Sequence, residues 1–253
     1  AGEAGLNTLL IEKNKLGGVC LNEGCIPSKT LLNSAKIYDH AAHGEKYGVT
    51  STGAAIDQAA VVARKNKVVK NLVSGIRAQL KSKKVTIQEG LGVITGRSAD
   101  GTITVKVGEE SFEGKRLLIA TGSEAVVPPI PGVREGMQDG SVVTNREILD
   151  LEKIPATMVV VGGGVIGLEM ANYFSTVGSK VTVVEMLDHI AGAADRELAE
   201  ILQKIFEKKG IVFHLGCQVT EVKGGKVSFK TPDGKIEQAD SEVTLMSVGR
   251  RAV

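Results

Sequence analysis

The chain has 253 residues, enough for one large or two medium domains, and its 31 Lys and Arg nearly balance its 29 Asp and Glu. The net charge of +2 gives no electrostatic argument for nucleic acid as the main partner, and no apolar run approaches the roughly 20 residues that a membrane span needs. Glycine is abundant, with 31 residues, and aromatic residues make up only 3%, a composition typical of parallel α/β sheets.

The first predicted element is a short apolar strand over residues 8–12, which follows Gly5 and ends at an acid, Glu12. Residues 178–185 repeat this pattern of glycine, strand and terminal acid, and there a glycine turn and a helix precede it. Counted back from Glu12 by the same interval, the matching turn of the first copy falls before residue 1. We therefore expect two similar units, the first without its first strand and phosphate loop.

Two cysteines follow the first strand. Cys20 and Cys25 lie in a glycine-rich segment with four residues between them, a spacing that allows a small, reducible disulfide ring. Pro27 indicates a helix start. Because Cys25 lies near that helix N-terminus, with Lys29 one turn on, we expect its thiolate to be stabilised.

Two alternatives for these cysteines remain open at this point. His40 and His43 complete a C-x4-C-x14-H-x2-H pattern, which suggests zinc although the histidine spacing is shorter than usual. The two thiols can also be unrelated. The third cysteine, Cys217, follows a predicted strand and is expected to be a small buried hydrophobe.

The middle of the chain predicts an amphipathic helix over residues 61–80, followed by antiparallel strands within residues 85–119. The helix has basic residues along it, which we interpret as a solvated face or, alternatively, as a surface for an acidic partner. They are Arg64, Lys65, Lys67, Lys70, Arg77, Lys81, Lys83 and Lys84. The proline-rich segment 128–132 predicts a stiff connection at the start of a domain crossover.

A glycine motif follows the apolar run 158–161. Gly162, Gly164 and Gly167 form G-x-G-x-x-G before a predicted helix, and the next strand ends at Glu185. Strand, turn, helix, strand and acid together predict a dinucleotide site. The glycines would allow the tight turn, the approach of pyrophosphate and close packing, while Glu185 would accept ribose hydroxyls. No Lys or Arg directly follows Glu185, which favours NAD over NADP.

The segment from Gly17 to Lys29 resembles the redox-active disulfide motif of the dihydrolipoamide dehydrogenases, within the pyridine nucleotide–disulfide oxidoreductases. Residues 117–123 are similar to that family's second FAD motif, residues 162–169 to its NAD motif, and residues 247–251 to the stretch that leads back to the FAD domain. The resemblance implies an α/β fold with two Rossmann-like domains, in three layers with parallel sheets and an antiparallel meander. The domains would be an N-terminally incomplete FAD domain, residues 1–143, and an essentially complete NAD domain, residues 144–253.

The resemblance also implies roles for individual residues. Cys20 would be the interchange thiol, Cys25 the sulfur against the flavin, and Lys29 a buried lysine near the flavin, paired with Glu169. The residues expected to contact FAD are Glu12, Lys13, Gly17, Gly18, Cys20, Lys29, Gly92, Ala120, Thr121 and Gly122. Those expected to contact NAD are Gly162, Gly164, Val165, Ile166, Gly167, Glu185, Val219 and Gly249. No metal ligand is expected.

The implied activity is oxidation of protein-bound dihydrolipoamide to lipoamide, with reduction of NAD⁺ to NADH through FAD. The implied partners are lipoyl domains and components of 2-oxo acid dehydrogenase or glycine cleavage complexes, in the cytoplasm or mitochondrial matrix, with the full-length enzyme a homodimer. The family's catalytic His and its Glu partner belong to a C-terminal domain without a counterpart in these residues, so no general base is assigned. Ala252 also stands where the family often has Pro. Alternatives are a mercuric or glutathione-type reductase, or an inactive NAD-binding fragment.

Overall fold

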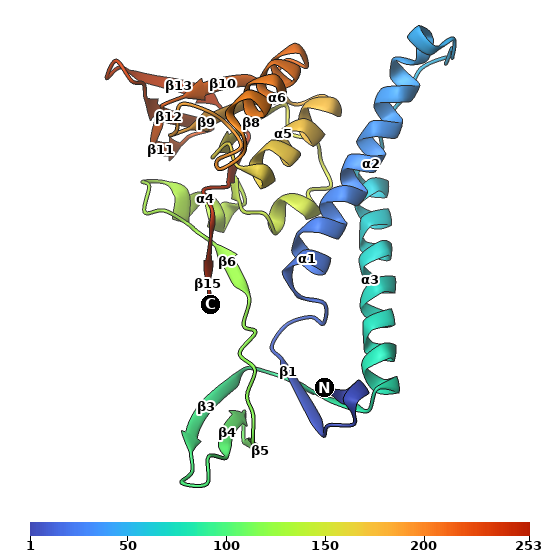
Figure 1. Ribbon diagram of the computed structural model, residues 1–253. Coiled ribbons are helices and arrows are strands. Elements are labelled where there is room, and N and C mark those ends of the chain that lie inside the picture. Colours follow the sequence, from blue (N-terminus) through green and yellow to red (C-terminus); the bar gives the residue numbers. More distant parts are fainter.

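The computed structural model describes residues 1–253, the side chain of Lys46 excepted. A five-stranded parallel sheet, in the order β10-β9-β8-β14-β7, forms the centre of the larger lobe (Figure 1). Its strands are β7 (Val142–Val143), β8 (Thr157–Val161), β9 (Lys180–Glu185), β10 (Val212–Leu215) and β14 (Val243–Met246). The central strand β8 is buried on both faces, which is why its sequence is an unbroken apolar run.

This sheet lies between two other layers. Because side chains alternate along a strand, Met158 and Val160 of β8 face one core, and Val159 and Val161 face the other. The first core is covered by α5 (Val165–Thr176) and α6 (Arg196–Lys208). The second is covered by α4 (Val133–Asp139) and an antiparallel meander of β11 (Gln218–Lys223), β12 (Lys226–Lys230) and β13 (Ile236–Asp240). The three-layer α/β prediction with a meander is confirmed here.

The smaller lobe contains two separate sheets. β1 (Thr8–Glu12) pairs in parallel with β2 (Val85–Glu89), and an antiparallel meander follows, of β3 (Gly92–Arg97), β4 (Ile103–Val107) and β5 (Glu110–Gly114). Antiparallel pairing was therefore the wrong prediction for β2. The reason is the connection: the segment between β1 and β2 contains three helices and forms a crossover, which returns the chain in the same direction.

Three helices join the lobes: α1 (Gly18–Glu23), α2 (Cys25–Ala42) and α3 (Gln58–Ser82). Short 3₁₀ turns occupy Gly2–Ala4, Gly44–Tyr47 and Glu147–Asp150, labelled η1 to η3. β6 (Ser123–Ala125) pairs antiparallel with β15 (Arg250–Ala252) where the chain passes between the lobes (Figure 1). β7 pairs with β14 in the larger sheet, so residues 142–143 pack with the second half of the chain. The domain division at 143/144 stays a prediction.

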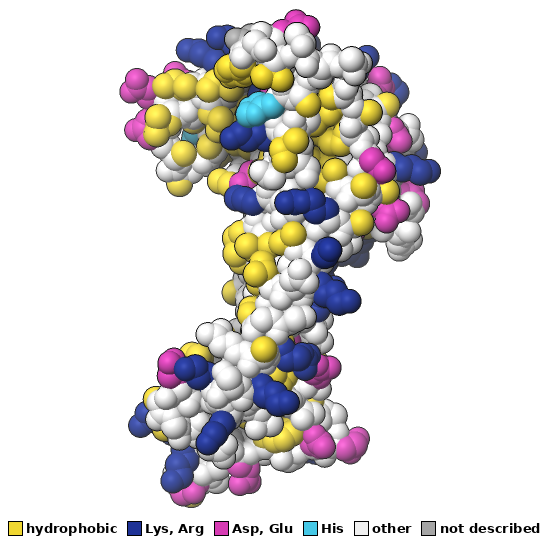
Figure 2. Space-filling view, turned by 90° about the vertical axis from the view of Figure 1, so that its right-hand side faces the viewer, with side chains coloured by type: hydrophobic (Ala, Val, Ile, Leu, Met, Phe, Trp, Pro, Cys, Tyr) yellow, Lys and Arg dark blue, Asp and Glu magenta, His cyan; other side chains and the backbone are white. Residues whose placement is uncertain are grey.

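The predicted helix at 61–80 is confirmed as α3, which begins earlier because the Asp57 carboxylate accepts a hydrogen bond from the Ala60 N–H. Basic side chains are spread along the face of the molecule shown in Figure 2. Lys65, however, is only 4% exposed and is ion-paired with Asp150, so the prediction of a solvated face is wrong for this residue.

No helix among the described residues is both long and apolar enough to cross a bilayer.

A buried hydrogen bond also joins α3 to the larger lobe. Tyr173 of α5 is fully buried, and its hydroxyl donates to Gln58 Oε1 over 2.5 Å. Burial raises the pKa of Tyr173 to about 12, because the phenolate would lose its hydration. The folded state therefore holds this proton more tightly than the unfolded chain, whose tyrosine titrates near pH 10. We expect the free energy of unfolding to fall by up to about 2–3 kcal/mol as the pH rises from about 10 to 12.

The control for this prediction is Tyr173→Phe, which has no proton to lose. Urea unfolding at a series of pH values from 8 upward should show a steeper alkaline loss of stability for the wild type than for the variant. Parallel curves for the two proteins would contradict the prediction.

Candidate functional site

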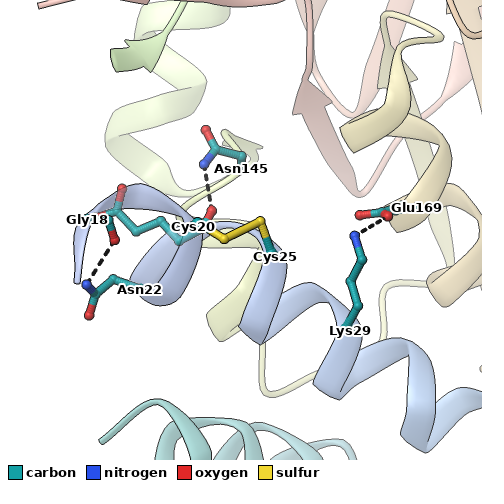
Figure 3. Close-up of a disulfide and its surroundings, with 8 residues drawn as sticks. Gly18, Cys20, Asn22, Cys25, Lys29, Asn145 and Glu169 are labelled. Atoms are coloured by element: carbon teal, nitrogen blue, oxygen red, sulfur yellow. Dashed lines mark hydrogen bonds and ion pairs between the residues drawn. A yellow bond between two sulfur atoms is a disulfide. The ribbon is translucent and has the colours of Figure 1, made fainter. Parts of the chain in front are cut away.

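Cys20 and Cys25 form a disulfide, with their Cα atoms 4.8 Å apart (Figure 3). Cys20 lies in α1, and Cys25 is the first residue of α2, as the position of Pro27 predicted. Each thiol is bonded to the other, so the structure supports neither the zinc alternative nor two unrelated thiols. Both cysteines are exposed, and therefore open to attack by another thiol.

The predicted pair of Lys29 and Glu169 is confirmed. Lys29 Nζ, one turn after Cys25, lies 2.5 Å from Glu169 Oε1 of α5 (Figure 3). The expectation that this lysine is buried is wrong, because its side chain is 60% exposed, and water therefore screens the attraction. What the pair does show is geometry: the disulfide helix reaches directly to the helix of the glycine motif.

The glycine motif has the backbone geometry that its spacing predicts. Gly162 has φ +104°, and a Cβ there would meet Ser247 O at 2.4 Å. A Cβ on Gly167 would lie 2.3 Å from Gly162 O, so this glycine allows the helix to pack closely on the turn. Gly164 differs, since no heavy atom lies within 4 Å of the position of its Cβ. The first and third glycines serve the fold, whereas the second opens space beside the turn.

That open space adjoins the N-terminus of α5. The helix begins at Val165, and no side chain caps it, so the N–H groups of Val165 and Ile166 are available to an anion. Glu185 ends β9 beside the turn, and its carboxylate accepts hydrogen bonds from the N–H groups of Gly163 and Leu187, at 2.6 and 2.7 Å. Open space, free N–H groups and an oriented carboxylate together fit a dinucleotide.

A cation that the local sequence did not indicate contacts the loop after Glu185: Arg196, the first residue of α6. Both Nη atoms of Arg196 donate to the Asp188 carboxylate, at 3.2 and 3.1 Å, and His189 Nδ1 lies 2.7 Å from the same group. The hydrogen bond with His189, together with Arg196, lowers the pKa of Asp188, and the Asp188 hydrogen bond raises the pKa of His189. A nearby cation could in principle receive the 2′-phosphate of NADP, but Arg196 is already paired with Asp188. We therefore keep the preference for NAD over NADP as a prediction.

The acid at the end of β1 repeats the geometry of Glu185. Glu12 Oε1 accepts from the N–H of Asn14, two residues on, just as Glu185 Oε1 accepts from Leu187. The chain then turns through Gly17 and Gly18, both with positive φ, into α1. The two acids that end the repeated strands thus accept the same local hydrogen bond.

Other features of the first half fit a bound group. Asn22 donates to the carbonyls of Leu16 and Gly18, but its buried Oδ1 has no hydrogen-bond partner among the described residues. Gly92 opens β3 beside Ile11 of β1, and Lys13 is exposed. An unpartnered buried acceptor next to a glycine turn suits a ligand that brings a donor.

The predicted second FAD motif, residues 117–123, forms no strand before Ser123, where β6 begins. Residues 115–122 belong to no helix or strand, and Leu118 is 88% exposed. After Ala120, Thr121 Oγ1 donates to Val253 O, and the Val253 N–H donates to the carbonyl of Gly122, whose φ is +78°. The segment thus lies against the C-terminal residues and presents apolar surface.

The remaining predicted NAD contacts are spread more widely. Val219 lies on β11, and its side chain is buried in the second core, so only its backbone is free to face a ligand. The N–H of Cys217, the residue before that strand, donates to Glu185 O. Gly249 has φ +115° and accepts from the Val126 N–H. Burial raises the pKa of the Cys217 thiol, in keeping with the predicted structural role.

Sequence reasoning missed the residues that hold the disulfide loop from outside. Asn145 and Arg146 both contact Glu23, which lies between the two cysteines. One signal was available, because these polar residues come two and three positions after the end of β7, a buried strand of a parallel sheet. Ligands and functional residues gather at the carboxyl ends of such strands.

Comparison with known proteins agrees with this geometry. The family model for pyridine nucleotide-disulphide oxidoreductases matches residues 1–253. The dihydrolipoyl dehydrogenase of Acholeplasma laidlawii is 42% identical over 253 residues, which cover all of this chain and 74% of that protein. The mitochondrial dihydrolipoyl dehydrogenase of Dictyostelium discoideum is 40% identical over 99% of this chain and 52% of its own length.

Among solved structures, the HOCl-induced flavoprotein disulfide reductase RclA from Escherichia coli superposes with a TM-score of 0.80 at 27% identity, over 100% of this chain and 53% of that one. The chain thus spans about half the length of most of these proteins and three quarters of one. Sequence, fold and the disulfide agree, and the chain belongs to the pyridine nucleotide–disulphide oxidoreductase family.

Proposed function

We propose that the protein oxidises dihydrolipoamide, carried on a lipoyl domain, to lipoamide and passes the two electrons through Cys20–Cys25 and FAD to NAD⁺. One observation carries this proposal. The disulfide lies at the N-terminus of α2, and one turn later Lys29 contacts Glu169 of the helix that follows the glycine motif. A dithiol acceptor and a dinucleotide site are therefore joined by direct contact. The names of the A. laidlawii and D. discoideum relatives support the choice of substrate.

The two cysteines have different chemical positions. Cys25 is at the first turn of α2, where free N–H groups and the helix dipole stabilise a thiolate. A substrate thiolate that attacks Cys20 Sγ breaks the disulfide and expels Cys25 as this stabilised thiolate. The second substrate sulfur then attacks the mixed disulfide, closes lipoamide and releases Cys20. Both electrons of the substrate dithiol are then held on the two cysteines.

The same proposal assigns the cofactor contacts. Bound FAD and NAD supply the two-electron transfer that side chains cannot perform. For FAD we propose the turn through Gly17 and Gly18, with Glu12, Lys13, Lys29, Gly92 and the segment 120–122. For NAD we propose the free N–H groups at the start of α5, the space at Gly164, and Glu185. Lys29 and Glu169 hold α2 and α5 in register between these two sites. No metal enters this proposal.

Glu185 tests the dinucleotide site. Changing Glu185 to Gln keeps its size but removes the charge, so the ribose hydroxyls and the N–H groups of Gly163 and Leu187 lose an anionic acceptor. We expect NADH to bind more weakly by about 1.5–3 kcal/mol, measured by fluorescence titration. Glu242→Gln is the matched control, since Glu242 accepts from the Ala156 N–H on the same lobe. Equal NADH affinities of wild type and Glu185→Gln would refute the assignment.

The activity itself is tested by three parallel assays on the purified protein: dihydrolipoamide with NAD⁺, glutathione disulfide with NADPH, and Hg(II) with NADPH. We expect a yellow protein that turns over dihydrolipoamide fastest and shows long-wavelength thiolate–flavin absorbance after two-electron reduction. Faster turnover of glutathione disulfide or Hg(II) would favour those reductases instead. A colourless protein that still binds NADH would favour a non-catalytic nucleotide-binding role.

The wider setting is part of the same proposal. The partners would be lipoyl domains and components of a 2-oxo acid dehydrogenase or glycine cleavage complex, with a homodimer for the full-length enzyme. The compartment would be the cytoplasm, or the mitochondrial matrix in a eukaryote, because a cysteine pair that cycles suits a reducing environment. Sedimentation of the full-length protein measures the oligomeric state.

A further inference from the structure

A short chain of hydrogen bonds joins the disulfide loop to the connection between the lobes. Glu23 is the last residue of α1 and lies inside the ring that Cys20 and Cys25 close. Its backbone carbonyl accepts a hydrogen bond from Asn145 Nδ2 at 3.0 Å (Figure 3). Because α1 ends here, this carbonyl has no partner within the helix, and Asn145 supplies the missing donor.

Asn145 is buried, with 8% of its surface exposed, and both ends of its amide are used. Its Oδ1 accepts from Arg250 Nη1 at 2.8 Å, while its Nδ2 faces the carbonyl of Glu23. This orientation is the only one that satisfies both partners, because a guanidinium only donates and a carbonyl only accepts. A buried amide bonded at both ends fixes the distance between its two partners.

The network continues on both sides. Arg250 also donates to Ser123, through Nε to Oγ at 2.9 Å and through Nη2 to the carbonyl oxygen at 2.6 Å. Ser123 and Arg250 open the paired strands β6 and β15, where the chain passes between the lobes. Arg146 Nε lies 2.8 Å from Glu23 Oε2 and adds a second, more exposed contact to the loop. Through Asn145 and Arg250, the disulfide loop is therefore hydrogen-bonded to the paired strands β6 and β15.

We propose that Asn145 is a positioning residue that sets the reduction potential of Cys20–Cys25. In the oxidised protein the S–S bond itself constrains the loop. After reduction only non-covalent contacts hold the two thiols together, and Asn145 provides such a contact at the carbonyl of Glu23, the last residue of α1. Keeping the reduced loop ordered raises the effective concentration of one thiol at the other, which favours the disulfide. The proposal deepens the proposed function and rests on it for its biological use.

The test is the equilibrium of the flavin-loaded protein with glutathione buffers: protein dithiol and glutathione disulfide give the protein disulfide and two glutathione molecules. Alkylation and mass measurement of Cys20 and Cys25 report the reduced fraction. For Asn145→Ala we expect the equilibrium constant for disulfide formation to fall about five- to tenfold, so that the potential rises by about 20–30 mV. Asn172→Ala, which removes an amide bonded to Lys209 elsewhere on α5, is the matched control and should leave the potential unchanged.

A second variant separates the two ends of the amide. Asn145→Asp keeps an acceptor for Arg250 but cannot donate to Glu23, so its potential should rise as in Asn145→Ala. Thermal unfolding of each variant reports whether it is folded. An unchanged potential in either variant would overturn the proposal, since the bond to Glu23 would then not carry the effect. This readout needs no turnover, so a wild type without dihydrolipoamide activity would refute the proposed function and leave this result intact.

Discussion

Replacing Cys25 by serine should lower dihydrolipoamide:NAD⁺ turnover on the order of a thousandfold or more, because the substrate dithiol then has no disulfide to reduce. Serine has nearly the size of cysteine, and Cys25 is exposed at the first turn of α2, so the fold should be unaffected. NADH binding should also be unaffected, since the disulfide lies on α2 and not at the start of α5. Steady-state assays and NADH titration measure the two effects separately.

Two further cysteine variants sharpen this result. Cys20→Ser should lose turnover to the same extent, yet retain Cys25, so that flavin-loaded Cys20→Ser keeps the long-wavelength thiolate absorbance while Cys25→Ser lacks it. Cys217→Ser is the control, since Cys217 is buried in the second core and contacts neither of the other cysteines. Full dihydrolipoamide activity in Cys25→Ser would show that the disulfide mechanism is wrong.

The second large effect concerns two glycines of one motif, which the structure separates into a packing role and a binding role. Gly167→Ala places a Cβ 2.3 Å from Gly162 O and 2.9 Å from Val160 Cγ1, so the backbone must shift. We expect it to destabilise the protein by about 3 kcal/mol in urea unfolding, as overpacking of a close helix–strand contact does. Any loss of NADH binding should follow from this loss of structure.

Gly164→Ala should behave in the opposite way. Its φ of −75° suits alanine, and no heavy atom lies within 4 Å of the new Cβ, so the urea midpoint should stay near that of the wild type. The methyl group would instead occupy space proposed for the pyrophosphate, and we expect at least about tenfold weaker NADH binding. A folded Gly164→Ala protein with normal NADH affinity would show that the nucleotide does not use this space.

The sequence carried most of the candidate site because its main parts are local. Cys20 and Cys25 are close along the chain, and the turn at Gly162 and the acid at Glu185 belong to one strand–helix–strand unit. Spacing alone therefore allowed a reducible ring and predicted a dinucleotide turn. The contact between Lys29 and Glu169, 140 residues apart, was expected only through the family resemblance. The wrong expectation of a buried Lys29 has the same origin, because exposure depends on which chain segments surround a side chain.

By itself the sequence determined the glycine turn, the parallel α/β character, the internal repeat and the position of Cys25 at a helix start. Each of these depends on backbone conformation and periodicity over a short stretch. Only the tertiary structure decided that β2 pairs in parallel with β1, that Lys65 is buried against Asp150, and that Asn145 holds the carbonyl of Glu23. These features need partners distant in the chain, and hydrophobic periodicity shows which face of an element is buried without identifying the residue that lies against it.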